Sequence, residues 1–504
     1  MRGFGTETDA NDDHFGSGLS FVDKIVNWIR ALLPKDGFAR GVTMVAGGTT
    51  VGQLITVLVS PVLTRLYSPE EFGLLAVYNS VLSVAATVVA LRYEYAIPLA
   101  DDDEKAGNLV VLALFIVLVT TSGSALLVFS FGADAASWAN VSGLASYLWL
   151  IPLGILGDGV YQVLNYRVTR AKEFSGIGYT RISRKAGQAG TQVAGGFAGI
   201  GAIGLIGGLV VGRFAGIVAL ARRARLRLRH VDVRECLQQA KEWYRFPLYT
   251  AWGSLINVFG SKAPPILLSR FFVPDIAGYF SLTLRVLSLP SSLVGKAIGQ
   301  VFYPLVAEKE GEEQEQKEMV ERTATILLLI ALPIFATVGL LGPTLFTWVF
   351  GPSWEVSGEY AQYLAPWLAL SLVSSPLSTF VFAKDEQGRA FGLTIYETTL
   401  RLGVLWVGGR VLESSAWTVM LYSGAGMIIS TVYIGWVLRL SGSGILEWGR
   451  TMRGPLIEAA VIIGALAVLK PMVGMGSYVV LVALGILGIG GRSIFRIREH
   501  MRYE

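Results

Sequence analysis

Apolar segments of about twenty residues recur along the whole chain, and they constrain its fold more than any other feature. Of the 504 residues, 53% are hydrophobic and 16% are charged, whereas soluble domains carry about 25% charge. A helix of about 20 apolar residues crosses the hydrocarbon core of a bilayer. Fourteen spans are predicted, approximately at 42–63, 72–91, 107–131, 144–165, 186–199, 201–221, 246–269, 278–303, 324–350, 360–383, 392–409, 415–438, 455–469 and 476–490. We therefore expect an all-α polytopic membrane protein, in which the fifth span is short and weak.

Lysine and arginine are distributed very unevenly between the segments that connect these spans. If the N-terminus is inside and the spans alternate, the inner segments hold 33 of the 42 basic residues, the outer segments hold 4 and the spans hold 5. Loops rich in Lys and Arg remain in the cytoplasm. We expect a protein of the cell (inner or plasma) membrane with both termini cytoplasmic, and the net charge of +5 does not indicate a nucleic-acid partner.

One stretch occurs twice, 205 positions apart. Residues 61–83 (PVLTRLYSPEEFGLLAVYNSVLS) and 266–288 (ILLSRFFVPDIAGYFSLTLRVLS) each join two apolar spans through a turn. The identical pairs are Leu63/Leu268, Arg65/Arg270, Pro69/Pro274, Gly73/Gly278, Val81/Val286, Leu82/Leu287 and Ser83/Ser288. Six spans, an even number, separate the copies. We therefore expect two parallel halves related by an axis along the membrane normal, with a transport path between them.

The repeat and the charges divide the chain into five parts. They are a cytoplasmic tail with an interfacial helix at 21–33 (1–41), an N-lobe (42–221), a basic cytoplasmic linker (222–245), a C-lobe (246–438), and two further spans with a cytoplasmic C-terminus (439–504). A weaker echo supports the two halves, because Phe174, Tyr179 and Arg184 correspond to Phe391, Tyr396 and Arg401 at a shift of 217.

Charged residues inside the spans are the candidates for function. Each costs about 2.5–3.5 kcal/mol at mid-span on the insertion scale, so it usually faces a cavity or a partner. The predicted cavity cations are Arg213, Lys262, Arg285, Lys296 and Arg401. On the eighth span Arg285 and Lys296 share one helix face with two serines. A cavity with excess positive charge suits a phosphate or pyrophosphate group.

Acidic residues within the spans are fewer. Asp158 and Glu397 are the candidates for ion or proton coupling, together with Glu458, although a structural hydrogen bond is the alternative for each. Glu397 precedes Arg401 by four residues, so these two side chains can also neutralise each other. A second set of cations, Arg181, Arg184 and Lys185, is predicted to reach the inner surface from the start of the fifth span.

Several kinds of chemistry have no support in the sequence. There is one cysteine, and all three histidines lie outside the apolar spans, so neither a disulfide framework nor a Cys/His metal site is expected. No catalytic residues and no cofactor are predicted. The longest predicted outer loop, 132–143, has no His, Lys or Arg and one acidic residue. Tryptophans 138, 149, 354 and 367 are expected to form an aromatic belt at the outer surface.

Two long stretches resemble a known family. They are GVTMVAGGTTVGQLITVLVSPVLTRLYSPEEFGLLAVYNSVLSV with LRYEYAIPLADDDEKAGNLVVLAL, and KAPPILLSRFFVPDIAGYFSLTLRVLSLPSSLVGKAIGQVFYPLVAE. Both resemble the polysaccharide biosynthesis, or O-antigen, flippases of the multidrug/oligosaccharidyl-lipid/polysaccharide exporter superfamily. The resemblance implies a two-lobed bundle of twelve helices plus two, like that of MATE transporters. No residue role carries over from it.

The resemblance also implies a function. A flippase of this kind moves a polyprenyl-pyrophosphate-linked oligosaccharide from the inner to the outer leaflet by alternating access, for surface polysaccharides such as lipopolysaccharide. Its expected partners are the lipid bilayer, this lipid-linked substrate and polysaccharide assembly proteins. The alternatives are a peptidoglycan lipid-precursor flippase, a cation-coupled drug exporter of the MATE type, and a membrane polysaccharide polymerase or ligase. The drug exporter would favour an acidic cavity, and the polymerase would need a large polar outer loop.

Overall fold

The computed structural model describes residues 37–222, 232–295, 298–299, 302, 306, 308–309, 312–470 and 472–502. Within these residues every regular element is a helix, and no strand occurs. The interfacial helix predicted at 21–33 lies outside the described residues. The chain is a multi-pass membrane protein, in which eight described helices are long and apolar enough to cross a membrane: α2, α4, α7, α12, α13, α15, α16 and α17.

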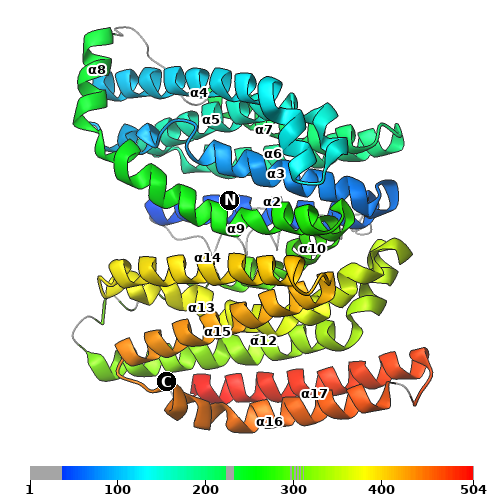
Figure 1. Cartoon of the computed structure of the whole chain (residues 1–504). Helices are drawn as coiled ribbons and strands as arrows, with labels where there is room; N and C mark the ends of the chain where they lie inside the picture. Colours follow the sequence, from blue (N-terminus) through cyan, green and yellow to red (C-terminus); the bar gives the residue numbers. More distant parts are fainter. Residues whose placement is uncertain are drawn as a thin grey trace, which may run out of the picture.

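The first group of helices is α2 (Gly37–Leu66), α3 (Pro69–Thr87), α4 (Asp103–Trp138), α5 (Leu150–Arg170), α6 (Phe174–Phe197) and α7 (Ala202–Ala221), with short 3₁₀ turns η1 (Tyr93–Leu99) and η2 (Ser142–Tyr147). These helices pack on one another: α6 on α2 and α7, and α5 on α4 and α7. In Figure 1 they form the upper, blue-to-cyan half of the molecule. Together they form the N-lobe.

The second group is α9 (Ala251–Phe271), α10 (Pro274–Leu287), α12 (Glu313–Phe350), α13 (Glu355–Ala383), α14 (Gln387–Arg410) and α15 (Ser415–Leu440), with short segments η3 (Phe246–Thr250), η4 (Ser291–Gly295) and η5 (Pro352–Trp354). Here α13 packs on α12 and α15, and α14 packs on α9 and α15. This C-lobe meets the N-lobe mainly where α3 contacts α9 and α10. Two helices, α16 (Ile445–Leu469) and α17 (Met475–Arg502), then lie against α12 at the edge of the bundle (Figure 1).

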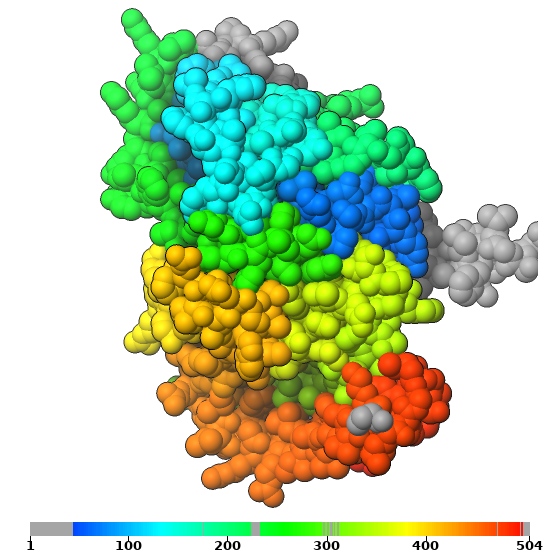
Figure 2. Space-filling model, turned by 45° about the vertical axis from the view of Figure 1, so that its right-hand side comes forward, coloured from blue at the N-terminus to red at the C-terminus, as the bar shows by residue number. Residues whose placement is uncertain are grey.

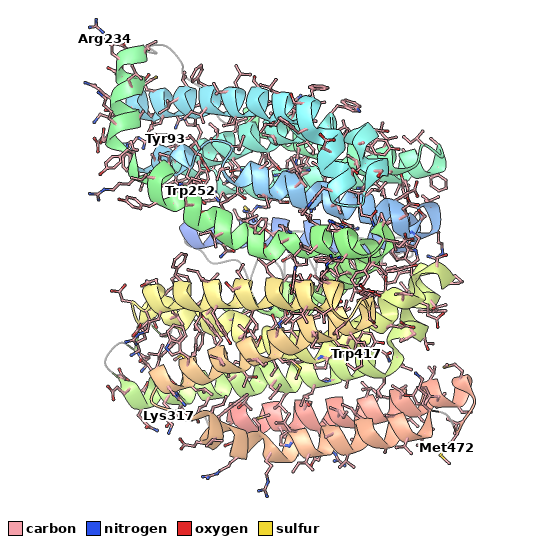
Figure 3. All side chains as sticks on the ribbon, in the orientation of Figure 1. Tyr93, Arg234, Trp252, Lys317, Trp417 and Met472 are labelled. Atoms are coloured by element: carbon pink, nitrogen blue, oxygen red, sulfur yellow. The ribbon has the colours of Figure 1, made fainter. Side chains whose placement is uncertain are left out.

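The link between the lobes includes helix α8 (Val233–Glu242), which lies across the ends of the N-lobe helices (Figure 1). The hydroxyl of Tyr93 donates to the carbonyl of Ala240 at 3.0 Å, and the buried Cys236 lies against Asn108 of α4. Figure 3 shows Tyr93, Arg234 and Lys317 at one end of the bundle and Met472 at the opposite end. We call these the inner and outer ends, following the orientation predicted from the charges.

The two copies of the repeated stretch occupy equivalent places in the two lobes. Tyr78 and Thr283, which correspond at the shift of 205, donate their hydroxyls to the carbonyls of Leu150 and Ser357, both at 2.8 Å. Leu150 lies in the first turn of α5 and Ser357 in the first turn of α13. These two helices hold corresponding places in the lobes, since α5 follows α3 and α4, and α13 follows α10 and α12. The two halves are thus arranged in parallel, as the repeat predicted. The residue limits given above for each lobe stay a prediction.

The turns of the repeat explain how its helices start. Ser68 caps α3 by accepting from the amide of Glu71 at 3.3 Å, and the Glu71 carboxylate accepts from the amide of Ser68 at 2.7 Å. Pro69 and Pro274 stand at the first helical positions, where the missing amide hydrogen costs nothing. Each proline therefore ends a turn at the outer end and starts a helix that runs along the lobe interface.

Two predicted boundaries and part of the predicted aromatic belt were wrong. The fifth span was expected at 186–199, but α6 begins at Phe174, because its polar first half faces protein rather than lipid. The outer loop expected at 132–143 is helical as far as Trp138, where α4 ends. The aromatic belt was wrong for Trp354 and Trp367, which are 0% and 7% exposed and pack inside the C-lobe and at its contact with the N-lobe.

Candidate functional site

A polar cavity lies between the lobes, at the middle of the helices. It consists of two connected pockets, each of about 330 Å³. Their shared lining residues are Asn79, Lys185, Gln188 and Leu209. One pocket extends between α2, α6 and α7 of the N-lobe, and the other extends to α9 and α10 of the C-lobe. The helices that supply most of the charge, α6, α9 and α10, do not meet the length and hydropathy required of a simple membrane span, which fits helices that face a cavity.

An ion-paired cluster around one carboxylate lies behind the wall of the N-lobe pocket. Asp158 of α5 accepts from Arg184 at 2.8 Å and from Arg213 at 2.7 Å, one bond to each oxygen. Arg213 also donates to the carbonyl of Leu209 at 3.0 Å, and the Arg184 guanidinium lies 4.1 Å from the centre of the Tyr161 ring. Arg181 bonds to the hydroxyl of Thr49 on α2. The cluster thus fastens α5, α6 and α7 together and retains excess positive charge.

The second pocket brings three cations from both lobes to one cavity. They are Lys185 of α6, Lys262 of α9 and Arg285 of α10. Lys185 is 3.3 Å from the amide oxygen of Gln188. Among the described residues, none of these three cations forms an ion pair, and no carboxylate lines either pocket. An anionic group that entered would therefore meet uncompensated positive charge.

The structure brings together some of the predicted site residues and separates others. Arg213, Lys262 and Arg285 line the two pockets, and their role in substrate binding stays a prediction. Arg401 is placed elsewhere: it pairs with Glu397 at 2.8 Å and lies between the rings of Trp367 and Tyr422, at 4.3 and 5.1 Å from their centres. Lys296 lies outside the described residues.

The three predicted coupling acids are all held by arginine. Asp158 binds two guanidinium groups, and Glu397 binds Arg401 within its own helix. Glu458 of α16 is 3.4 Å from Arg492 and 3.0 Å from Arg496 of α17. Each carboxylate is therefore ion-paired in this structure, and ion coupling through any of them stays a prediction.

Sequence reasoning missed three cavity residues: Arg181, Arg184 and Lys185. They were predicted to reach the inner surface because the fifth span was placed too late in the chain. In fact they lie in the first half of α6. Arg181, Arg184, Lys185 and Gln188 are three or four residues apart and therefore share one face of the helix. This polar face is the feature of the sequence that could have predicted a cavity here.

The outer end above the cavity is closed by direct contacts between the lobes. Arg65 of α2 donates to the carbonyl of Val349 on α12 at 2.9 Å, and the indole of Trp354 donates to the carbonyl of Thr64 at 3.0 Å. Asn140, which follows α4, donates to the carbonyl of Phe272 at 2.5 Å. In Figure 2 the blue surface of α2 and α3 meets the yellow-green surface of α12 and α13 without an opening on this face.

Two glycines of the repeat make this closure tight. A Cβ atom added to Gly73 would overlap the carbonyl oxygen of Pro274, and one added to Gly278 would overlap that of Pro69. Because Gly73 corresponds to Gly278 and Pro69 to Pro274, this is one contact made twice about a pseudo-two-fold axis. Glycine is required at both positions, since only a residue without a side chain lets the two helices approach so closely.

A polytopic bundle of two lobes, with a cationic cavity between them and one end closed, defines a membrane transporter. The chain belongs to the family of polysaccharide biosynthesis proteins, whose model matches residues 62–359. It is therefore a membrane transporter of polysaccharide biosynthesis.

Individual relatives agree with this assignment. The succinoglycan biosynthesis transport protein ExoT of Rhizobium meliloti is 25% identical over 80% of this chain and 81% of its own. The amylovoran biosynthesis protein AmsL of Erwinia amylovora is 20% identical over 23% of this chain and 30% of its own.

Solved structures show the same fold. The lipid II flippase MurJ in an inward closed conformation matches with a TM-score of 0.71 and 11% identity, covering 90% of this chain and 98% of its own. An inward-facing MATE-family multidrug transporter matches with a TM-score of 0.59 and 15% identity, covering 79% and 93%. At identities this low, the two matches concern the fold of this chain alone.

Proposed function

We propose that the protein moves a polyprenyl-diphosphate-linked oligosaccharide from the inner to the outer leaflet of the cell membrane. The observation that carries this proposal is the uncompensated group of Lys185, Lys262 and Arg285, contributed by both lobes to one cavity. A diphosphate is the anionic part of such a lipid. At an effective dielectric constant of about 20, one close pair of opposite charges is worth about 4 kcal/mol, so three cations provide ample attraction.

The position of these cations suits transport better than permanent binding. Lys185 belongs to the N-lobe, whereas Lys262 and Arg285 belong to the C-lobe. When the lobes part at the outer end, the distances between these charges increase, and the diphosphate loses contacts on one side. Lysine is a mobile point charge without fixed bidentate geometry, and two of the three cations are lysines. The site thus binds the group firmly when closed and weakly when open.

Two other transport functions are alternatives to this proposal, and they differ from it in the cavity or in the substrate that they require. A peptidoglycan lipid-precursor flippase would use the same head-group chemistry, and the fold match to MurJ does not distinguish it. A cation-coupled drug exporter would favour carboxylates facing the cavity, but none lines the two described pockets. The membership in a polysaccharide biosynthesis family favours the saccharide substrate.

The proposal is tested by complementation in a bacterial strain that lacks its own exopolysaccharide flippase. Surface glycan is measured for the unaltered protein and for Lys185→Gln and Lys262→Gln, with an immunoblot to show equal membrane levels. We expect each variant to lower surface glycan strongly. A matched control is Lys470→Gln, which removes a lysine beyond the end of α16. Rescue of a strain lacking its peptidoglycan precursor flippase, without rescue of surface glycan, would assign the alternative substrate.

A further inference from the structure

A second cavity, entirely different in character, lies beside the first. It has a volume of about 460 Å³ and is lined almost wholly by apolar side chains. Its walls are α4, with Leu127, Phe131, Ala135 and Trp138, and α9, with Phe259, Ala263, Ile266 and Leu267; its floor is α3, with Val77 and Val81. We call it the α4–α9 groove. Several wall residues are open to the bilayer, since Leu127 and Phe131 are each 62% exposed.

The groove and the cationic cavity share a partition only one helix thick. On α3, Ala76, Asn79 and Ser80 face the cavity, whereas Val77 and Val81 face the groove. On α9, Ser261, Lys262 and Pro265 face the cavity, whereas Ala263 and Ile266 face the groove. Since α3 and α9 belong to different lobes and pack on each other, parting of the lobes opens this partition. A molecule with a charged head and an apolar chain can then occupy both sides.

A cation stands at the outer mouth of the groove. Arg270 lies one helical turn beyond Ile266 on α9 and therefore continues the face that lines the groove. Its guanidinium carbon is 5.7 Å from the centre of the Trp138 ring, and Trp138 itself lines the groove and is 58% exposed. Such a cation at the level of the head groups complements the phosphate of a lipid whose chain lies in the groove.

The partition helix α9 is also built to bend. Pro264 and Pro265 stand in sequence at its middle. Neither has an amide hydrogen, so the helical bonds that would reach the carbonyls of Gly260 and Ser261 cannot form. Pro265 faces the cavity and Ala263 faces the groove, so the weakened turn lies in the partition itself.

We propose that the α4–α9 groove binds the polyprenyl chain of the transported lipid in the outer-leaflet half of the membrane, and that the seam between α3 and α9 is its lateral exit. This inference rests on the proposed function, because it assumes that the lipid's diphosphate occupies the neighbouring cationic cavity. The occupant is the carrier's own chain rather than that of a bilayer phospholipid, since the carrier's diphosphate has more negative charge for the cavity cations to attract than the single phosphate of a phospholipid.

The test uses the full-length protein in proteoliposomes with two photoreactive lipids, a polyprenyl diphosphate carrying a diazirine in its chain and a phosphatidylglycerol carrying one in its acyl chain. Labelled positions are mapped by mass spectrometry. We expect the polyprenyl probe to label the groove walls, at Leu127, Phe131 and Phe259, well above the phosphatidylglycerol probe. Equal labelling of the walls by both probes would mean that ordinary bilayer lipid fills the groove, which overturns the proposal.

A matched pair of variants sharpens the test. Ala135→Trp adds a large side chain inside the groove from an exposed position, whereas Ala133→Trp adds the same side chain two residues away, at an exposed position outside the groove. We expect several-fold less polyprenyl labelling for Ala135→Trp, because the added side chain occupies space that the polyprenyl chain would fill, and unchanged labelling for Ala133→Trp. Arg270→Gln should also lower labelling, whereas Arg410→Gln, an exposed arginine at the end of α14, should not. Equal effects within either pair would contradict the assignment.

A third measurement separates this inference from the proposed function. Binding of inorganic pyrophosphate to the detergent-solubilised protein reports on the cationic cavity alone. Ala135→Trp should bind pyrophosphate as well as the unaltered protein does, while Arg285→Ala should bind it more weakly. If the unaltered protein does not bind pyrophosphate, the proposed head-group site fails. If it binds pyrophosphate but its groove walls are not labelled by the polyprenyl probe, only the inference about the groove fails.

Discussion

The guanidinium carbon of Arg285 lies 5.6 Å from the centre of the Phe72 ring, across the boundary between the two lobes. Phe72 is also in edge-to-face contact with Trp354, with 4.9 Å between ring centres and an angle of 74°. The indole of Trp354 in turn donates to the carbonyl of Thr64. One side chain, Phe72, therefore touches both a cation of the cavity and the closure of the outer end. We therefore expect an anion that draws Arg285 away from Phe72 to weaken that closure.

Replacing Phe72 with leucine should make the outer end open more readily. The change removes the attraction between the ring and Arg285, worth about 0.5–2 kcal/mol, together with the contact to Trp354. The measurement is labelling of Ser281→Cys, a cavity position, by a membrane-impermeant maleimide in a Cys236→Ser background. We expect labelling from outside to become about 2- to 30-fold faster.

The control for this change is Phe346→Leu, which alters a buried aromatic residue of α12 that packs on Phe350 within the C-lobe. It should leave the labelling rate unchanged. Equal rates in all three proteins would show that Phe72 is a packing residue without influence on the outer end.

The glycine contact of the repeat should be sensitive to the smallest possible side chain. Gly73→Ala places a Cβ atom against the carbonyl of Pro274, and overpacking of this kind costs about 1–3 kcal/mol. The cost falls on the closed state, so we expect faster labelling of Ser281→Cys and lower surface glycan. Gly123→Ala on α4 is the matched control, because a Cβ there meets no neighbour within 4 Å.

Because the two glycine contacts are related by the pseudo-two-fold axis, substitutions at Gly73 and Gly278 should have similar effects. Gly278→Ala should resemble Gly73→Ala, because Gly278 makes the equivalent contact with Pro69. The double variant should open the outer end less than the sum of the two single effects, since both contacts are lost when the same helices separate. A silent Gly278→Ala beside a strong Gly73→Ala would contradict the view that the two contacts form one closure.

Asp158 should matter for stability more than for substrate. It is the only carboxylate found in contact with Arg184 and Arg213 among the described residues, and its side chain is 13% exposed. Asp158→Asn leaves two largely buried guanidinium groups without a counter-charge, and removing one partner of a buried pair costs about 3–5 kcal/mol. We expect a clearly lower melting temperature in detergent.

The double variant Asp158→Asn with Arg213→Met tests the cause of that loss. It removes one unpaired charge and keeps a side chain of similar length, so it should regain part of the lost stability. Asp134→Asn, near the outer end of α4, should have no effect. If the double variant is less stable than Asp158→Asn alone, charge compensation is not the main role of this aspartate.

Much of the fold follows from the sequence because membrane proteins obey few and strong rules. The apolar spans, the excess of basic residues on one side, and the repeat around Pro69 and Pro274 predicted the helical bundle and its parallel halves. The repeat predicted the parallel halves because each half needs a proline to start the helix and a glycine for close approach, so both residues occur at equivalent positions of the sequence. The sequence could not show that Gly73 and Gly278 face each other's prolines, since this contact depends on how the lobes dock.

The site was only partly predictable, for two physical reasons. Arg213 has no acidic residue near it in the sequence, and its partner Asp158 comes from a different helix, so its neutralisation depends on tertiary packing. Lys185 was placed at the membrane surface because hydropathy underestimates helices that line a polar cavity. The pairing of Glu397 with Arg401, by contrast, is local to one helix turn and was foreseen as one of two outcomes.

Removal of α16 and α17 should leave a folded transporter core. These helices contact mainly α12, through an apolar cluster that includes Leu340, Leu466 and Tyr478. In a bilayer the face of α12 that they leave becomes covered by lipid, which is as apolar as the lost neighbours. We expect truncation after Ser441 to give a monodisperse protein in detergent that still binds pyrophosphate. Aggregation, or loss of that binding, would show that the two helices support the cavity.

The sharpest prediction concerns the charge at position 285. Arg285→Ala removes one of three uncompensated cations, and hydrogen bonds to charged groups are worth about 1.5–3 kcal/mol, so pyrophosphate affinity should fall about 10- to 150-fold. Arg285→Lys should keep a good part of the affinity, because a point charge serves a group that must later leave. Arg285→Glu should bind less than Arg285→Ala, because it repels the anion. The measurement is pyrophosphate binding in detergent, alongside surface glycan and an immunoblot. Arg439→Ala, at the inner end of α15, is the matched control. If Arg285→Glu binds pyrophosphate as well as the unaltered protein, the anion does not occupy this cavity.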